Sequence, residues 1–237
     1  YLITNYEFES RPINGLNLFP KIISPFDKEF IDEIKFLKTF TSEYVKHQFT
    51  HLNFRNNHWL ADGLSIYLII KYVEINYPNQ KLIGKLADFP IINKYSLSNL
   101  KFNEIFMINS ELMLRRNLHQ PATTSKDLLI KYNERIATSY QVGLFFRYLE
   151  DYIGDESFRF ILNEIHTINN IDDLILSINK YSNKVDSSNV IKYLNTKHTL
   201  DFKINKVVKS DNKISVYTTQ ISNQNIPFKV TILKDNN

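Results

Sequence analysis

Cysteine is absent from the 237 residues of this chain, and glycine is scarce, with only 5 positions. The first absence excludes disulfides, thiolate zinc sites and cysteine nucleophiles, although it does not fix the cellular compartment. The second leaves no glycine-rich loop that could cradle a phosphate and no Gly-x-Ser-x-Gly nucleophile elbow. These chemistries are therefore set aside.

Long apolar runs are also missing. Residues 66–70 are all apolar, but the run ends at Lys71 and is far shorter than a membrane-spanning helix. The net charge is +4, with lysine and arginine interspersed among acids, and no basic block is interleaved with aromatics. We therefore expect no membrane span in this chain and no nucleic-acid partner.

The chain does contain enough apolar side chains for a core, with 43% hydrophobic and 14% aromatic residues, which argues against disorder. It begins at Tyr1 rather than methionine, in what reads as folded sequence without a signal peptide. We expect it to be a piece of a longer protein. An export signal would then lie upstream, so an exported or cell-envelope location stays open.

Hydrophobic periodicity divides the chain into three parts. Residues 1–26 are interrupted by prolines and are predicted to form an irregular lead-in. Residues 27–195 repeat their apolar positions at helical spacing, and in residues 196–237 the period changes to two. The expected fold class is therefore mainly α, followed by a partial β domain. The three predicted strands cover residues 200–204, 214–216 and 228–232.

One predicted helix opens at Trp59, after a polar turn at residues 53–58, and is apolar nearly all round to about Val73. Such a helix is a buried one. Asp62 lies in its first turn, where acids are common because they favour the helix dipole. A carboxylate entering a core needs a partner, so we expect Asp62 to be mostly buried and hydrogen-bonded near the helix start.

The sequence Trp59-Leu-Ala-Asp62-Gly63-Leu-Ser-Ile-Tyr67 resembles the second zinc-site helix of the aminopeptidase-N-like gluzincin metallopeptidases. That family has Trp-Leu-Asn-Glu-Gly-Phe-Ala-x-Tyr, and its glutamate is the third zinc ligand. The resemblance implies that residues 27–195 are the helical C-terminal half of a thermolysin-like catalytic domain. It also implies that a β-sandwich segment follows.

A second, independent resemblance begins at Tyr140-Gln-Val-Gly143-Leu and ends at Gly154-Asp-Glu-Ser-Phe158. The family has Tyr-x-Lys-Gly-Ala and then Leu-Gly-x-Glu-x-Phe, and its tyrosine donates to the oxyanion of the tetrahedral intermediate. The resemblance therefore places Tyr140 at the oxyanion position.

The helix around Tyr140 carries further expectations. We expect a break near residues 138–139, which would leave Tyr140 at an exposed helix start, facing a cleft shared with Asp62. Gly143, one turn later, would allow a neighbouring helix to approach closely. Gly154 is expected to end the helix.

The family's other zinc ligands are two histidines in a His-Glu-x-x-His helix. Here the chain has His47-Gln48-Phe-Thr-His51, whose i, i+4 spacing puts both imidazoles on one face of a helix. The resemblance implies that His47, His51 and Asp62 are the metal ligands, and His58 is a further candidate close to Asp62.

Three departures from the family pattern indicate decay of the site. Gln48 replaces the general base, and an amide cannot accept a proton at neutral pH. Ten residues separate His51 from Asp62, against eighteen in the family, and aspartate reaches less far than glutamate.

Three hypotheses remain open. The chain is a degenerate member of the family that binds peptides or proteins, a working zinc aminopeptidase with unusual ligands, or a plain helical scaffold. We favour the first, with zinc absent.

Overall fold

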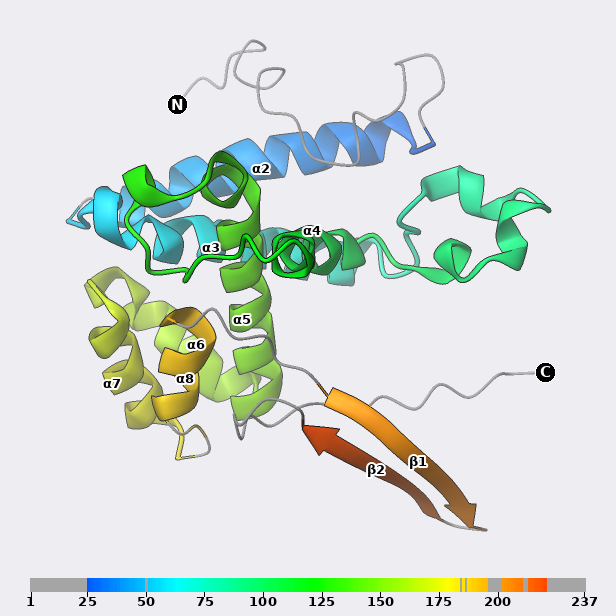
Figure 1. Cartoon of the computed structure of the whole chain (residues 1–237). Coiled ribbons are helices and arrows are strands. Elements are labelled where there is room, and N and C mark those ends of the chain that lie inside the picture. The colour runs from blue at the N-terminus through cyan, green and yellow to red at the C-terminus, as the bar shows by residue number, and fades with distance from the viewer. Residues whose placement is uncertain are drawn as a thin grey trace.

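The computed structural model describes residues 25–49, 51–183, 185, 187–195, 202–210 and 213–220. Within these ranges the chain is mainly helical, as predicted, and carries a two-stranded antiparallel sheet toward its C-terminal end (Figure 1). None of the described helices is long and apolar enough to cross a membrane. In chain order the elements are α2 (Lys28–Gln48), α3 (Phe54–Asn76), η2 (Gly84–Asp88), η3 (Ile92–Lys94), η4 (Ser96–Asn99), α4 (Glu104–Arg115), η5 (Lys126–Leu128), the π-helix η6 (Asn133–Ala137), α5 (Thr138–Ile153), α6 (Asp155–Glu164), η7 (Ile165–Thr167), α7 (Ile171–Tyr181), α8 (Ser187–Asn195), β1 (Phe202–Ser210) and β2 (Lys213–Gln220).

Helix α3 is the buried centre of the molecule, as its composition predicts. Residues 63–67 are buried in succession, and five consecutive residues turn through more than one full circuit of a helix. The predicted start at Trp59 is wrong, because α3 begins at Phe54, where the side chain of Asn53 accepts a hydrogen bond from the backbone of Arg55. The expected polar turn is thus the first turn of the helix, and it is set off only by a kink at Asn57.

Helix α5 runs across α3, and two glycines lie at the crossing (Figure 1). A Cβ added at Gly143 would lie 2.5 Å from Cγ2 of Ile66 and 3.2 Å from the carbonyl oxygen of Gly63. A Cβ added at Gly63 would lie 2.2 Å from Cγ1 of Val142. Each helix therefore needs hydrogen in place of a side chain where it touches the other, and the predicted close approach at Gly143 is confirmed.

The predicted break near residues 138–139 is wrong. The chain passes through η6 into α5 with helical dihedrals at Tyr132, Ala137 and Thr138, so the helix changes pitch without ending. A π-turn inserts one extra residue per turn while keeping the chain helical. The predicted end is confirmed, because Gly154 follows Ile153 with φ of 96° and leaves the helical path.

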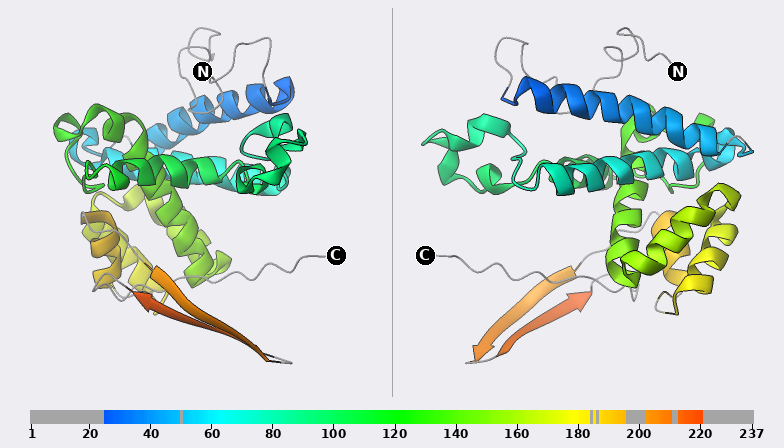
Figure 2. Two further views of the ribbon diagram at one scale, coloured as in Figure 1. Left: turned by 45° about the vertical axis from the view of Figure 1, so that its right-hand side comes forward. Right: turned by 180° about the vertical axis from the view of Figure 1, so that it is seen from behind.

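Two further groups of helices cover this crossing. Helix α2 lies along α3, with Ile34 and Val45 buried between them, while α6, α7 and α8 gather beside α5 on the opposite side of α3 from α2 (Figure 2). Tyr67 of α3 links the crossing to this second group, since its ring meets those of Phe146 in α5 and Phe158 in α6. The core therefore extends from α2 through α3 and α5 to the last three helices.

Strands β1 and β2 form a hairpin whose two faces differ in polarity. A bulge between Ile204 and Lys206 shifts the register, so that Ile204 and Val207 fall on one face together with Ile214 and Val216. Ile204 and Val207 are exposed. The alternation of apolar residues thus predicted strands in both places, but β1 continues to Ser210, past the predicted end at residue 204, and β2 is also longer than predicted. The predicted third strand at 228–232 lies outside the described residues, as does most of the predicted lead-in at 1–26.

The first testable prediction concerns the glycine crossing. Gly143→Ala should lower the free energy of unfolding by about 1–3 kcal/mol, because an inserted methyl group forces packed helices apart and outweighs alanine's better helix propensity. Urea unfolding followed by the fluorescence of Trp59, the one tryptophan, measures the change. Asn163→Ala, at an exposed position of α6, is the control and should change stability little. Equal stability of Gly143→Ala and the natural chain would contradict the crossing.

Candidate functional site

The predicted histidine pair does not share a helix. Helix α2 ends at Gln48, between the two residues, and Phe49 is turned into the core with none of its surface exposed. His47 lies in the last turn of α2, His51 lies in the turn that follows, and both side chains are exposed. The i, i+4 argument for a common metal fails here, because it requires an unbroken helix through both positions.

The predicted place of Asp62 near the helix start is wrong, because α3 begins at Phe54 and Asp62 lies well inside it. Its side chain is half-buried and not freely solvated. Within the described ranges, no group of three or more His, Asp or Glu side chains could hold a metal ion. The structure therefore does not bring His47, His51 and Asp62 together as one ligand set.

Tyr140 is buried, with 3% of its surface exposed, and the expected exposed helix start is wrong. Its ring meets Phe106 of α4 edge-on at 4.9 Å and packs in a cluster with Ile66 and Ile69 of α3. Burial raises the pKa of Tyr140 above its ordinary value, and Tyr132 adds to this. By helical spacing Asp62 shares a face of α3 with Ile66 and Ile69, so Tyr140 lies on the same side of α3 as Asp62.

His58 is the buried titratable group of this region, with 2% of its surface exposed. Neither of its ring nitrogens has a hydrogen-bond partner within the described structure. Burial, and to a lesser degree the charge of Lys126, lowers the pKa of His58 to about 4. Glu134 and the carbonyl of Arg55 act in the opposite direction, although that carbonyl does not accept a hydrogen bond in good geometry.

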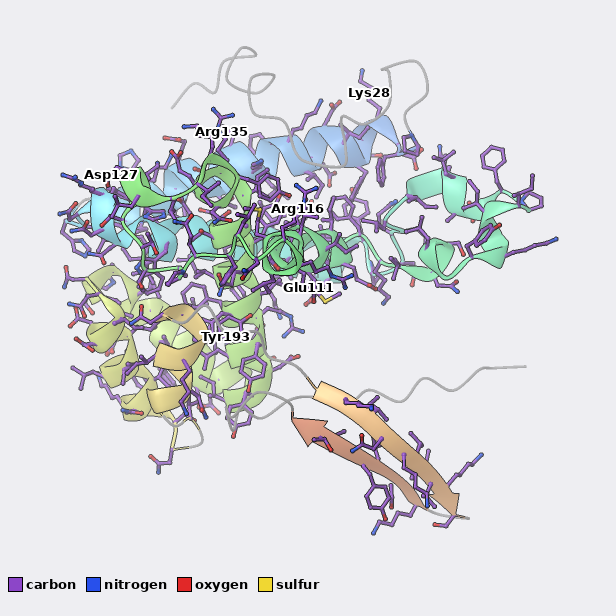
Figure 3. All side chains as sticks on the ribbon, in the orientation of Figure 1. Lys28, Glu111, Arg116, Asp127, Arg135 and Tyr193 are labelled. Carbon is purple, nitrogen blue, oxygen red and sulfur yellow. The ribbon has the colours of Figure 1, made fainter. Side chains whose placement is uncertain are left out.

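A polar clip holds the turn at η5 against the start of α3, next to His58. The guanidinium of Arg55 donates to both carboxylate oxygens of Asp127, at 3.1 and 2.6 Å. The hydroxyl of Ser125 donates to the side chain of Asn56 at 2.9 Å. Asp127 lies on the outer surface at this end of the molecule (Figure 3). The clip joins two segments that are far apart in the sequence.

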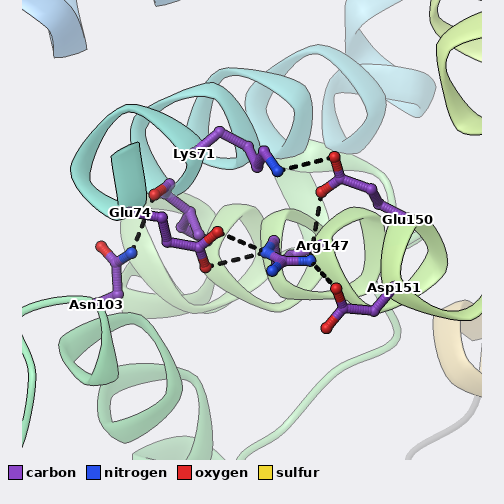
Figure 4. Close-up of polar contacts among 7 residues, drawn as sticks. Lys71, Glu74, Asn103, Arg147, Glu150 and Asp151 are labelled. Atoms are coloured by element: carbon purple, nitrogen blue, oxygen red, sulfur yellow. Dashed lines mark hydrogen bonds and ion pairs between the residues drawn. The ribbon is translucent and has the colours of Figure 1, made fainter. Parts of the chain in front are cut away.

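A larger ionic network joins α3 to α5 beyond the crossing (Figure 4). Nε of Arg147 donates to both carboxylate oxygens of Glu74, at 2.9 and 2.8 Å, and Arg147 also pairs with Asp151 and Glu150. Lys71 pairs with Glu150 at 2.9 Å. Burial alone would lower the pKa of Arg147, but Glu74 and Asp151 outweigh it and raise that pKa.

Sequence reasoning missed this network. The signal was present, because Arg147, Glu150 and Asp151 stand at i, i+3 and i+4, which are neighbouring positions on a helix face. Only the crossing brings Lys71 and Glu74 opposite them. Every acid in the network is paired with a cation, so the arrangement ties the two helices together.

The enclosed space between α5 and α8 is small. It measures about 20 Å³, and its lining includes Tyr148 and Tyr152 of α5 and Tyr193 of α8. Tyr193 is labelled in Figure 3. Burial raises the pKa of Tyr148 and of Tyr193 to about 12. A space of this size holds no more than a single water molecule, so it cannot accept a substrate or cofactor.

Comparison of the chain with protein-family models, with curated proteins and with solved structures found no match.

The second prediction concerns acid stability. Because the folded-state pKa of His58 is about 4 and the ordinary value is 6.5, the unfolded chain binds a proton at a pH where the folded chain does not. Stability should therefore be constant above about pH 7, fall between pH 6.5 and 4, and lose roughly 3 kcal/mol in all from this group. Urea unfolding across this pH range measures the loss.

The variants His58→Phe and His58→Gln should both flatten that dependence, while His166→Gln, at an exposed position, should retain it. An unchanged pH slope in both His58 variants would show that the imidazole is not buried as described.

The third prediction concerns the ionic network. Glu150 is 5% exposed and faces two cations, so Glu150→Gln should cost about 2–3 kcal/mol of stability by leaving Lys71 short of a counter-charge. Asp151→Asn is the matched control at the exposed edge of the same network and should cost less than about 1 kcal/mol. Chemical denaturation measures both. A larger loss for Asp151→Asn than for Glu150→Gln would overturn this ranking.

Proposed function

We propose that this chain is a degenerate, gluzincin-like helical domain that binds peptide or protein segments and does not hydrolyse them. The observation that carries the proposal is the end of α2 at Gln48. It parts His47 from His51 and leaves an amide at the position of the family's general base. A zinc-activated water needs both the ligands and a base, and neither requirement is met at this point.

The surroundings of Tyr140 support the same conclusion. An oxyanion donor must reach a bound substrate, and Tyr140 is packed instead against Phe106 and the isoleucines of α3. Its position on the Asp62 side of α3 is what the family likeness leads one to expect, whereas its burial fits a site that no longer opens to substrate.

A row of exposed aromatic rings on α2 supports the binding role. Phe36, Phe40 and Tyr44 are 47, 47 and 53% exposed, and they follow one another at single-turn spacing. Adjacent rings stack at 5.8 and 6.0 Å with nearly parallel planes. We call these three residues the α2 stripe. Because exposed apolar patches mark interaction sites and aromatic side chains dominate binding energies, the occupant would be a peptide segment that presents apolar or aromatic side chains.

The fourth prediction tests this role. Octapeptides that carry two aromatic residues should bind the chain more tightly than the same peptides with serine at those positions. Phe36→Ser/Phe40→Ser should weaken that binding by roughly tenfold or more, as loss of interface aromatic anchors does. Leu176→Ser removes an even more exposed apolar side chain from α7 and is the control. Fluorescence anisotropy with labelled peptides measures the affinities.

Metal content and turnover test the loss of catalysis. After dialysis at neutral pH, the chain should hold no stoichiometric zinc, and it should not release an aminoacyl fluorophore faster than His47→Ala does. One tightly held zinc per chain, lost in His47→Ala together with turnover, would overturn the proposal in favour of a working aminopeptidase.

A helical scaffold without a peptide site is the second candidate. It is favoured by the ionic network between α3 and α5, because every charged side chain of that network is paired with a charge of opposite sign. Equal peptide affinity of the natural chain and the α2 stripe variant would support it.

A further inference from the structure

A long loop projects from the end of the molecule, between α3 and α4. We call residues 81–101 the lobe. Its base is closed by backbone hydrogen bonds from Leu82 to Leu100, at 2.9 Å, and from Phe102 to Gln80, at 2.8 Å. Figures 1 and 2 show η2, η3 and η4 of the lobe standing beyond the ends of α3 and α4, away from α6, α7 and α8. The lobe thus projects beyond these helices, and the surface is hollowed between its first turn and the start of α2.

The lobe turns large apolar side chains outward. Ile91 is 77% exposed, Tyr95 65%, Phe89 56% and Leu97 46%. Among the lobe residues whose side chains are described, the fully buried ones are small, as Ala87 and Ser98 are. Packing of the lobe itself therefore does not account for the large exposed apolar residues, and concentrated apolar exposure of this kind marks an interaction site.

The lobe is also basic. Its sequence holds four lysines, at positions 81, 85, 94 and 101, against a single acid, Asp88. Lys85 pairs with Asp27 at the start of α2, whereas Lys94 and Lys101 are exposed and make no ion pair with any described residue. These two lysines thus lie in the same segment as the exposed apolar side chains. Within the described part of the chain, neither lysine is neutralised by an ion pair.

We propose that the lobe docks onto the surface of a lipid bilayer that contains anionic lipids. Phe89, Ile91, Tyr95 and Leu97 enter the boundary between headgroups and acyl chains, and the exposed lysines meet the lipid phosphates. Apolar burial and attraction to anionic headgroups together drive such binding. Tyrosine suits this depth, because its ring is apolar and its hydroxyl can remain among the headgroups.

The shape of the lobe favours a bilayer over a protein partner. The exposed apolar side chains stand on a projection, from which they can enter the boundary between headgroups and acyl chains. A protein partner would be held better by a groove than by a projection. The lobe lacks acidic residues other than Asp88, so little opposes approach to a negatively charged surface. Docking through the lobe is independent of peptide binding at the α2 stripe.

Vesicle flotation with the full chain tests the proposal. The chain should float with vesicles of phosphatidylcholine that contain a minority of phosphatidylserine, float less with pure phosphatidylcholine, and lose binding as salt is raised. Lys94→Gln/Lys101→Gln should weaken the partition by roughly 30-fold, since each lysine near a bilayer surface contributes about fivefold. Lys203→Gln/Lys209→Gln, which removes two exposed lysines from β1, should leave it unchanged.

Depth can be measured at single sites, because the chain contains no cysteine. Ile91→Cys and Leu176→Cys each give one attachment point for an environment-sensitive fluorophore, at positions 77 and 67% exposed in the natural chain. With anionic vesicles the label at position 91 should brighten and shift to shorter wavelength, and the label at 176 should not. Phe89→Ser/Ile91→Ser should reduce flotation by roughly tenfold or more without changing the fluorescence of Trp59.

Three outcomes would overturn the proposal: no flotation with anionic vesicles, equal responses of the labels at 91 and 176, or equal effects of the two lysine pairs. A label at 91 that shifts with protein concentration in the absence of lipid would instead assign the lobe to a protein contact, and would also overturn it.

Discussion

The close crossing of α3 and α5 is the constraint on which the rest of the structure depends. Where the helices touch, Gly63 and Gly143 leave no room for a side chain on either. This contact fixes how the helices are rotated, so Tyr140 turns into the core on one side of it. Further along the same pair of helices, Arg147 reaches Glu74 across the gap. One small-residue contact thus sets both the apolar cluster and the ionic network, because helices that interdigitate cannot rotate independently.

Sequence patterns predicted the helical class, the burial of α3 and the end of α5 at Gly154, because burial and a left-handed backbone position leave direct traces in residue type. The sequence patterns failed where the same residue types are compatible with two different backbone conformations. The polar residues after Asn53 are compatible with a turn or with an exposed first helical turn, and only packing decides between them. The π-turn before Thr138 keeps helical dihedrals, so no breaker residue marks it.

The candidate zinc site shows that a correct spacing of two histidines does not by itself bring them onto one helix. His47 and His51 keep i, i+4 spacing, but Phe49 is fully buried, and α2 ends where the chain turns to bury it. Spacing on a helix has meaning only while the helix continues, and α2 ends between the two histidines. His58 is the converse case. It lies in a stretch predicted to be a polar turn, yet its side chain is buried.

Large apolar side chains are exposed in three places that differ in construction: the α2 stripe on a continuous helix, the lobe on a closed loop, and the bulged face of the hairpin. A different local feature brings them together in each place. It is single-turn spacing in the α2 stripe, closure of the loop at its base in the lobe, and the shift of register in the hairpin. The core has its own complement of fully buried rings, including Trp59, Phe102 and Phe146, and the enclosed space beside α5 is too small for a ligand. Exposed groups of this size are costly in water unless something covers them. These three exposed groups are therefore the surfaces on which the proposed binding by this chain rests, and the crossing of α3 and α5 holds the helices that carry the first two of them in place.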